Sequence, residues 1–254
     1  MRASIGTVGA TAGMRAHATH LLLLTTALRC PPPRCDVSVR LVDDSELSDK
    51  DAPLFDPLAS TIAQCMFNPQ NNAELATYAK ETRRNLVDVF AGSHRREPTA
   101  VGRSALLVAE DDESGALVGV AGIQAISQTP DGRGEDQQRF MKRDKRALMD
   151  VRPLLSNVAV VPSHRRQGIA SRMVQSAEDV VRAWGFDELL LLVNERNGGA
   201  RALYAQRGYT VEGEPLDGEE CDIQALWFFG GGQRVTWRTC KNVCMRRQGL
   251  SGLT

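Results

Sequence analysis

Apolar and polar side chains recur along this chain with spacings that predict strands and helices. Residues 37–42 alternate between the two kinds, as expected of a strand with one buried face. Residues 168–184 place their apolar side chains at helical spacing and predict an amphipathic helix. Three charged residues of this helix fall on its other faces: Glu178, Asp179 and Arg182. Residues 189–193 are all apolar, so they predict a strand that is covered on both faces.

The other elements complete a regular series. The remaining helices are predicted at 57–67, 73–91 and 199–206, and the remaining strands at 105–109, 117–123, 154–161, 209–211 and 235–245. The order β-α-α-β-β-β-α-β-α-β-β predicts the α/β fold class, an α+β mixed sheet with helices on both sides. A polar insertion at 127–150 and a glycine-rich excursion at 213–234 interrupt the series. Loops of this length on a compact domain are either functional or disordered.

The composition is that of an ordinary globular protein. The 254 residues carry 31 basic and 31 acidic side chains, which argues against a broadly basic nucleic-acid-binding protein. No apolar run approaches the length that crosses a bilayer, so no transmembrane segment is expected. The balanced charge likewise predicts no nucleic-acid partner. The six cysteines form no C-x-x-C pair and the four histidines are too few to complete a zinc site, so no metal is expected.

The balanced charge hides a basic leader. Residues 1–35 contain four arginines and no acidic residue, and they are rich in Ala, Thr and Gly. This composition is typical of an organelle transit peptide, although a disordered tail and a secretory signal share parts of it. We therefore predict a disordered transit peptide at 1–35, one domain at 36–245 and a flexible tail at 246–254.

The turn before the amphipathic helix carries the most informative chemistry. It reads Arg165-Arg166-Gln167-Gly168-Ile169-Ala170. A helix N-terminus offers free backbone N–H groups and a partial positive charge, and Gly168 lets an anion approach that backbone closely. With its two arginines the turn predicts a pyrophosphate site, although it lacks the patterns of a P-loop and of a dinucleotide fingerprint. An ordinary capped turn with surface arginines is the alternative.

This turn resembles the acyl-CoA-binding motif of the GNAT N-acetyltransferase superfamily. The motif, Arg/Gln-x-x-Gly-x-Gly/Ala, is matched by Arg165, Gly168 and Ala170. Residues 157–162 are similar to the strand and proline turn that precede the motif in this family. Residues 197–209 are similar to its downstream signature, Asn-x-x-Ala-x-x-Leu-Tyr-x-x-x-Gly-Phe/Tyr.

The resemblance spans about residues 36–211 and implies a GNAT-like acyl-CoA N-acyltransferase fold. In that fold the central strands, here 154–161 and 188–193, splay apart. The co-substrate acetyl-CoA lies with its pantetheine arm in the gap and its diphosphate on the turn. The implied cofactor-binding residues are Val158, Ala159, Val160, Arg165, Arg166, Gln167, Gly168, Ile169, Ala170, Ser171 and Asn197.

The resemblance also implies an acetyl-CoA-dependent N-acetyltransferase that works by direct attack of a primary amine on the thioester. Tyr204 matches the family's general acid, which protonates the leaving thiolate; a core aromatic is the alternative role. The backbone N–H of Val160 is the implied oxyanion donor. Asn197 is expected to contact the cofactor arm or to cap a helix.

The general base is left open. Many family members carry a carboxylate on the strand before the turn, whereas this chain has Ser156 and Asn157 there and Val161 before the proline. A water relay is one solution, and Glu110 or Glu195 are alternatives that are more often surface charges. The missing carboxylate keeps a second hypothesis open, a CoA-binding regulatory domain without turnover.

The acceptor is expected to be a protein N-terminus, a lysine or a small arylalkylamine. Both interrupting segments are expected to shape its channel, and Asp217, Glu219, Glu220 and Asp222 could attract a cationic amine. Leader and domain together resemble plastid-type acetyltransferases of plants and algae. This predicts a chloroplast location, with the mitochondrion or cytoplasm as alternatives.

Overall fold

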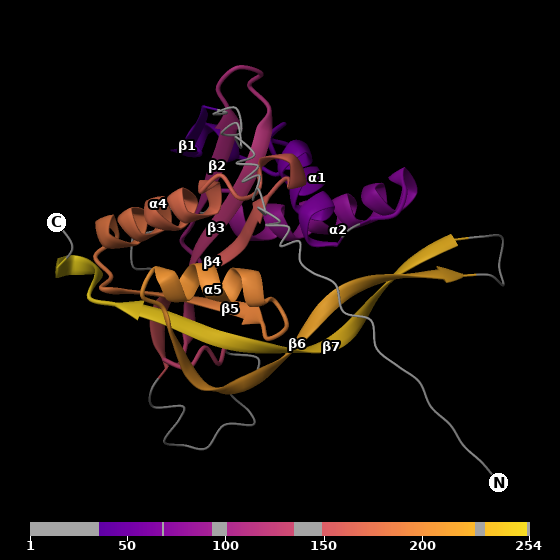
Figure 1. The fold of residues 1–254 in the computed structure, drawn as a ribbon. Helices are drawn as coiled ribbons and strands as arrows, with labels where there is room; N and C mark the ends of the chain where they lie inside the picture. The colour runs from indigo at the N-terminus through magenta and orange to yellow at the C-terminus, as the bar shows by residue number, and fades with distance from the viewer. Residues whose placement is uncertain (1–35, 68, 93–100, 135–148, 227–231, 253–254) are drawn as a thin grey trace, which may run out of the picture. The chain divides into compact units, whose positions relative to one another are not determined.

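The computed structural model describes residues 36–67, 69–92, 101–134, 149–226 and 232–252. The predicted order of elements is confirmed (Figure 1): β1 (Val37–Leu41), α1 (Phe55–Met66), α2 (Asn72–Phe90), β2 (Ser104–Asp111), β3 (Leu117–Gln128), β4 (Asp150–Val160), α4 (Ile169–Ala183), β5 (Glu188–Asn194), α5 (Gly198–Gln206), β6 (Thr210–Leu226) and β7 (Gly232–Gln248). The predicted transit peptide at 1–35 lies outside the described residues and stays a prediction.

The strands form one mixed sheet in the order β1-β2-β3-β4-β5-β7-β6. All neighbouring strands are antiparallel except β4 and β5, which run parallel. These two central strands pair only at Leu154 with Leu190 and at Leu155 with Leu191. The predicted splay is therefore present, and it opens toward the C-terminal ends of both strands.

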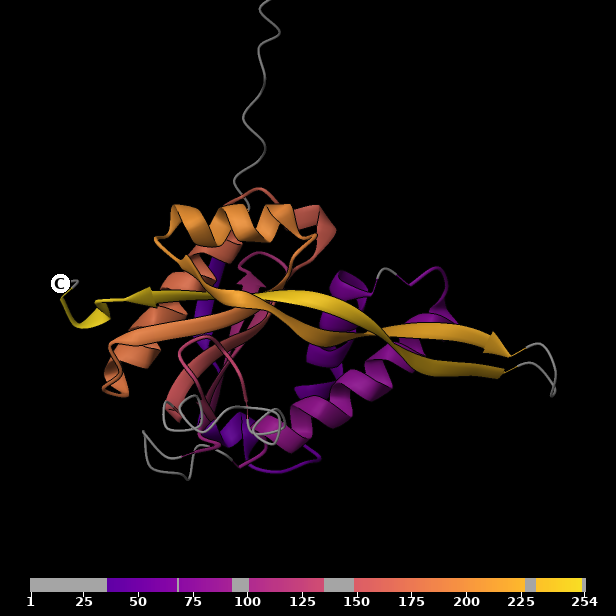
Figure 2. The same cartoon turned by 90° about the horizontal axis from the view of Figure 1, so that it is seen from below.

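Helices cover both faces of the sheet, and each face has its own hydrophobic cluster (Figures 1 and 2). On one face, α4 buries Ile169, Met173, Val174, Ala177 and Val181 against Leu189 and Leu191 of β5. On the other face, α1 and α2 bury Phe55, Leu58, Ile62, Leu86 and Phe90 against β2 and β3. In β5 the side chains of Leu189, Leu190 and Leu191 are all buried, which confirms cover on both faces for this part of the strand, whereas Leu192 is 39% exposed.

The predicted excursion at 213–234 is wrong: β6 and β7 form a hairpin of two 17-residue strands across this segment. Acidic residues and glycine disfavour strands, and that composition led to the prediction of a loop. Cross-strand partners offset the low propensity, as where Lys241 Nζ lies 2.6 Å from Asp217 Oδ1. β7 pairs with β5 only from Asn242 onward, so the rest of the hairpin continues as a two-stranded ribbon (Figure 2).

Two other segments differ from the sequence-based boundaries. Within the predicted insertion, β3 continues to Gln128 and β4 already begins at Asp150, while residues 135–148 lie outside the described residues. In the predicted tail, residues 246–248 belong to β7, and Leu250 in the following 3-10 turn (Leu250–Gly252) is fully buried. Its carbonyl accepts a 2.8 Å hydrogen bond from Arg182 Nε on α4, which fixes this end of the chain.

Candidate functional site

A β-bulge in β4 creates the gap between the central strands. Ser156 pairs with Gly122 and Ala159 with Val120, so two residues of β4 lie opposite the single Ala121. Asn157, in the bulge, has a left-handed φ of 54°, a conformation that asparagine tolerates better than most residues. The extra residue reverses the alternation of the strand: Leu155 packs in the cluster under α4, whereas Ala159 packs in the cluster under α1 and α2.

Beyond the bulge, β4 turns unpaired backbone groups toward the gap. The N–H of Val161 donates to Val118 O of β3 at 2.9 Å. Backbone groups alternate in direction along a strand, so those of Val160 and Val158 point away from β3, where β5 no longer pairs with β4. Val160 O accepts a 2.9 Å hydrogen bond from Arg165 Nε. By this alternation the N–H groups of Val158 and Val160 have no acceptor on β3 or on β5, and such groups need one.

The N-terminus of α4 lies directly after this strand and has no side-chain cap. Gly168 is its N-cap residue, with a left-handed φ of 79°, and Arg166 two residues earlier has φ 68°. Successive backbone N–H groups in a turn with such left-handed residues form a concave nest that suits anions. A Cβ placed on Gly168 would meet no atom within 4 Å, so the space beside this residue is open. The backbone from Arg166 to Ser171 therefore fits a diphosphate, as the motif predicts.

The structure gives Arg165 a bracing position. Its Nε binds the carbonyl of Val160, and its Nη2 lies 3.4 Å from the carbonyl of Cys65 at the end of α1. The guanidinium thus joins the end of β4 to α1. Gln167 Nε2 lies 3.5 Å from Ser163 O, which stabilises the turn itself.

Of the two residues predicted in this region, Tyr204 lies on α5 and Asn197 immediately precedes it, after β5. Tyr204 is 6% exposed, its ring packs against Tyr209 with centroids 5.8 Å apart, and its hydroxyl has no hydrogen-bond partner among the described residues. Burial raises the pKa of Tyr204 to about 12, so the phenol carries its proton at neutral pH. Asn197 is the N-cap residue of α5, where its Oδ1 accepts a 3.1 Å hydrogen bond from the N–H of Ala200.

The predicted base candidates are not brought together. Glu110 is on β2, which β3 separates from the gap, and its carboxylate pairs with Arg40 at 2.9 Å. Glu195 is exposed just after β5. Ser156 Oγ lies 3.4 Å from Gly122 O, beside the bulge.

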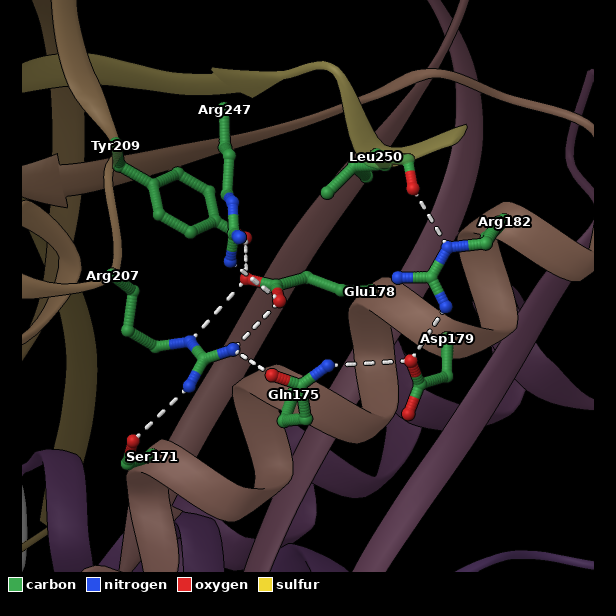
Figure 3. A network of polar contacts seen from close by, with 9 residues as sticks. All are labelled: Ser171, Gln175, Glu178, Asp179, Arg182, Arg207, Tyr209, Arg247 and Leu250. Carbon is green, nitrogen blue, oxygen red and sulfur yellow. Dashed lines mark hydrogen bonds and ion pairs between the residues drawn. The ribbon is translucent and has the colours of Figure 1, made fainter. Parts of the chain in front are cut away.

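One buried charge cluster was missed by the sequence analysis. The helical pattern of α4 places Glu178 away from the apolar face, yet its side chain is 0% exposed. It lies among three side chains from other elements (Figure 3). Arg207 comes from the end of α5, Tyr209 from the residue before β6 and Arg247 from β7. The signal available in the sequence was weak: an arginine before the Gly208 turn and another near the end of β7.

The described residues contain no helix that is long and apolar enough to cross a membrane. Within the same ranges, no group of three or more His, Cys, Asp or Glu side chains could hold a metal ion.

Comparison with known proteins gives one match to a family and several individual relatives. The Acetyltransferase (GNAT) family matches residues 74–209. GCN5-related N-acetyltransferase 10, chloroplastic, of Arabidopsis thaliana is 38% identical over 63 residues, which are 24% of this chain and 25% of that protein. The alignment thus spans about a quarter of the length of this relative.

Two solved structures illustrate the structural similarity. The YncA structure from Salmonella typhimurium, with its cofactor acetyl-CoA, is 19% identical with a TM-score of 0.41 over 84% of this chain and 94% of that chain. PaiA N-acetyltransferase from Thermoplasma acidophilum, in complex with coenzyme A, is 13% identical with a TM-score of 0.48 over 84% of this chain and 99% of that chain.

The matched residues 74–209 make up more than half of the 254 residues and run from α2 to the turn after α5. They include the bulge of β4, the gap beside it, the uncapped start of α4 and Tyr204. These four features of the candidate site therefore fall within the matched segment. The chain belongs to the acetyltransferase (GNAT) family.

Proposed function

We propose that this protein is an acetyl-CoA-dependent N-acetyltransferase that transfers an acetyl group to a primary amine by direct attack. The observation that carries the proposal is that two sets of unpartnered backbone N–H groups follow each other along the chain. A pantetheine arm in the gap would pair with Val158 and Val160, with Ala159 between them. The diphosphate would rest on the N–H groups from Arg166 to Ser171, through Gln167, Gly168, Ile169 and Ala170.

The reaction needs charge stabilisation and two proton transfers. The amine nitrogen bonds to the thioester carbonyl carbon, and the N–H of Val160 would stabilise the oxyanion that forms. The C–S bond then breaks, and the CoA thiolate takes a proton from the hydroxyl of Tyr204. Burial that raises the pKa of Tyr204 to about 12 also disfavours a thiolate in the same surroundings, so the transfer need not run strongly uphill.

The proton of the attacking amine leaves by a different route. Glu110 is engaged by Arg40, and Glu195 is exposed beyond β5. Ser156 and Asn157 are at the bulge, but neither side chain is a competent base at neutral pH. We propose that water carries this proton, relayed by these two residues or by a backbone carbonyl.

The acceptor class and the location are part of the proposal. A protein N-terminus, a lysine side chain or an arylalkylamine would each supply the primary amine. The chloroplastic Arabidopsis relative and the arginine-rich leader support a plastid location. Imaging of residues 1–35 fused to a fluorescent protein tests the location, and a cytosolic or secreted signal would contradict it.

A second candidate is a CoA-binding regulatory domain without turnover. The specific observation in its favour is that Ser156, Asn157 and Val161 stand where many family members have a carboxylate. The unpartnered and protonated hydroxyl of Tyr204 favours the enzyme instead.

One experiment separates the candidates. The full chain is titrated with acetyl-CoA by calorimetry and then incubated with peptides, proteins and small amines, with release of free CoA and acetylated products measured by mass spectrometry. Binding with turnover supports the enzyme, and binding without turnover on any acceptor supports the regulatory domain. If folded protein gives no heat of binding, both proposals are overturned.

A further inference from the structure

The buried cluster around Glu178 holds more positive than negative charge. The Glu178 carboxylate accepts hydrogen bonds from Arg207 Nη2 at 2.6 Å and Nε at 3.3 Å, from Arg247 Nη1 at 2.7 Å and from the hydroxyl of Tyr209 at 3.2 Å (Figure 3). One carboxylate therefore faces two guanidinium groups. The adjoining pair, Asp179 with Arg182 at 2.9 Å, balances itself and leaves this excess unchanged.

Arg207 carries the excess charge toward the start of α4. Its Nη1 lies 3.3 Å from Ser171 Oγ, and its Nη2 also contacts Gln175 Oε1. Ser171 is the third residue of α4 and belongs to the first turn, where the N–H groups have no helical partner. The Arg207 side chain is 15% exposed, so part of it is accessible from solvent. Arg247 instead contacts Glu178 from β7, with no contact to the first turn among the described residues.

We propose that Arg207 is a phosphate-binding residue of the coenzyme A site and that Glu178 is its positioning residue. This inference rests on the proposed function, because it assigns a cation to the diphosphate region of that site. Arg165 is engaged with the carbonyls of Val160 and Cys65. Arg207 instead reaches the first turn of α4 through Ser171, and its two-point contact with Glu178 holds the guanidinium in one orientation there.

The decisive experiment compares the signs of the effects on affinity. The full chain and its Arg207→Gln, Glu178→Gln and Arg247→Gln variants are titrated with coenzyme A by calorimetry, and their melting temperatures are measured. All three variants should melt at lower temperature, because each leaves a buried charge with fewer partners. Arg207→Gln should bind coenzyme A roughly 10-fold more weakly or worse, in line with loss of a charge-assisted interaction. Glu178→Gln keeps the shape and removes the negative charge, so its affinity should be equal to or higher than that of the unmodified chain.

Two further measurements keep the test valid if Glu178→Gln does not fold. Arg207→Lys keeps the charge and should regain part of the affinity that Arg207→Gln loses. The affinity of the unmodified chain should also fall more steeply with salt than that of Arg207→Gln, because the variant presents one cation fewer to the phosphates.

Each outcome has one meaning. If the unmodified chain binds coenzyme A and Arg207→Gln binds it equally well, the inference is overturned while the proposed function stands. Equal losses of affinity in Arg207→Gln, Glu178→Gln and Arg247→Gln would show a purely structural cluster and would also overturn it. Absence of binding by the unmodified chain overturns the proposed function itself.

Discussion

The two ends of α4 offer a matched pair of substitutions that separates backbone strain from ligand binding. Gly168 precedes the helix with φ 79°, and Gly185 follows it with φ 89°. At both positions a Cβ would meet no atom within 4 Å, so neither alanine variant clashes with the protein. Gly168→Ala and Gly185→Ala therefore impose the same kind of backbone penalty at opposite ends of one helix.

The expected cost in stability is similar for both variants. A residue with a Cβ in the left-handed region loses about 1–2 kcal/mol. For a chain of 254 residues this corresponds to a fall in melting temperature of roughly 2–8 °C, at about 2–4 °C per kcal/mol. Differential scanning calorimetry without ligand measures both values, and they should agree within about 1 kcal/mol.

The expected effects on coenzyme A binding differ. The methyl group of Gly168→Ala takes up part of the open space beside the turn, where we expect it to hinder the close approach of a phosphate to the first N–H groups of α4. Loss of one hydrogen bond to a charged group costs about 1.5–3 kcal/mol, so the Kd should rise roughly 10- to 100-fold. Gly185→Ala should keep the Kd of the unmodified chain. Equal Kd values for the two variants would refute the placement of the diphosphate on this turn.

The remaining predictions concern the acid and the gap. Tyr204→Phe should lower kcat by roughly 10²- to 10⁴-fold in stopped assays. Its affinity for acetyl-CoA, measured by calorimetry, should be unchanged. An unchanged kcat would remove Tyr204 from the mechanism. Burial raises the pKa of Tyr204 from 10 to about 12, so its contribution to stability is complete below pH 10 and lost as pH rises toward 12. Between about pH 10 and pH 12 the unfolding free energy of the unmodified chain should therefore fall by about 2–3 kcal/mol more than that of Tyr204→Phe. Identical pH profiles of the unmodified chain and the variant would contradict this. In Gly122→Ala the new methyl group would lie 2.6 Å from Phe90 Cζ and 2.9 Å from Ser156 Oγ, so urea unfolding should show about 1–3 kcal/mol of destabilisation. Gly134→Ala is the control, because a Cβ there meets no atom within 4 Å. Equal stability of the two variants would contradict the prediction.

Elements whose burial follows a local period were predictable from the sequence. The helix expected at 168–184 is observed as Ile169–Ala183, and the all-apolar run at 189–193 lies within β5. The apolar stripe indicates a helix with one buried face, and the run without alternation indicates cover on both faces, which holds for Leu189, Leu190 and Leu191 but not for Leu192. The turn at Gly168 was predictable for a similar reason, because a glycine between a strand and a helix permits the left-handed conformation that is observed.

The features that sequence analysis missed depend on partners far away in the chain. Residues 213–226 form a strand because 232–242 pair with them, which no local propensity records. Glu178 lies off the apolar stripe of its helix, yet it is buried because Arg207 and Arg247 approach from other elements. A helical period describes one helix alone, whereas a buried ion cluster is a property of the assembled layers.

The bulge of β4 connects these lines of argument, because it explains how backbone atoms can make a binding site. Without the additional residue at Asn157 and Val158, the alternation of the strand would continue unchanged and Ala159 would share a face with Leu155. With it, the strand reverses its faces and leaves β5 after Leu155, and the N–H groups of Val158 and Val160 lose their neighbour. The left-handed conformation of Asn157 costs free energy, and regular pairing of β3 with β4 on both sides of the bulge maintains it. A site made of backbone groups needs no carboxylate at Ser156 or Asn157, so the missing carboxylate bears on proton removal and leaves the proposed binding of coenzyme A intact.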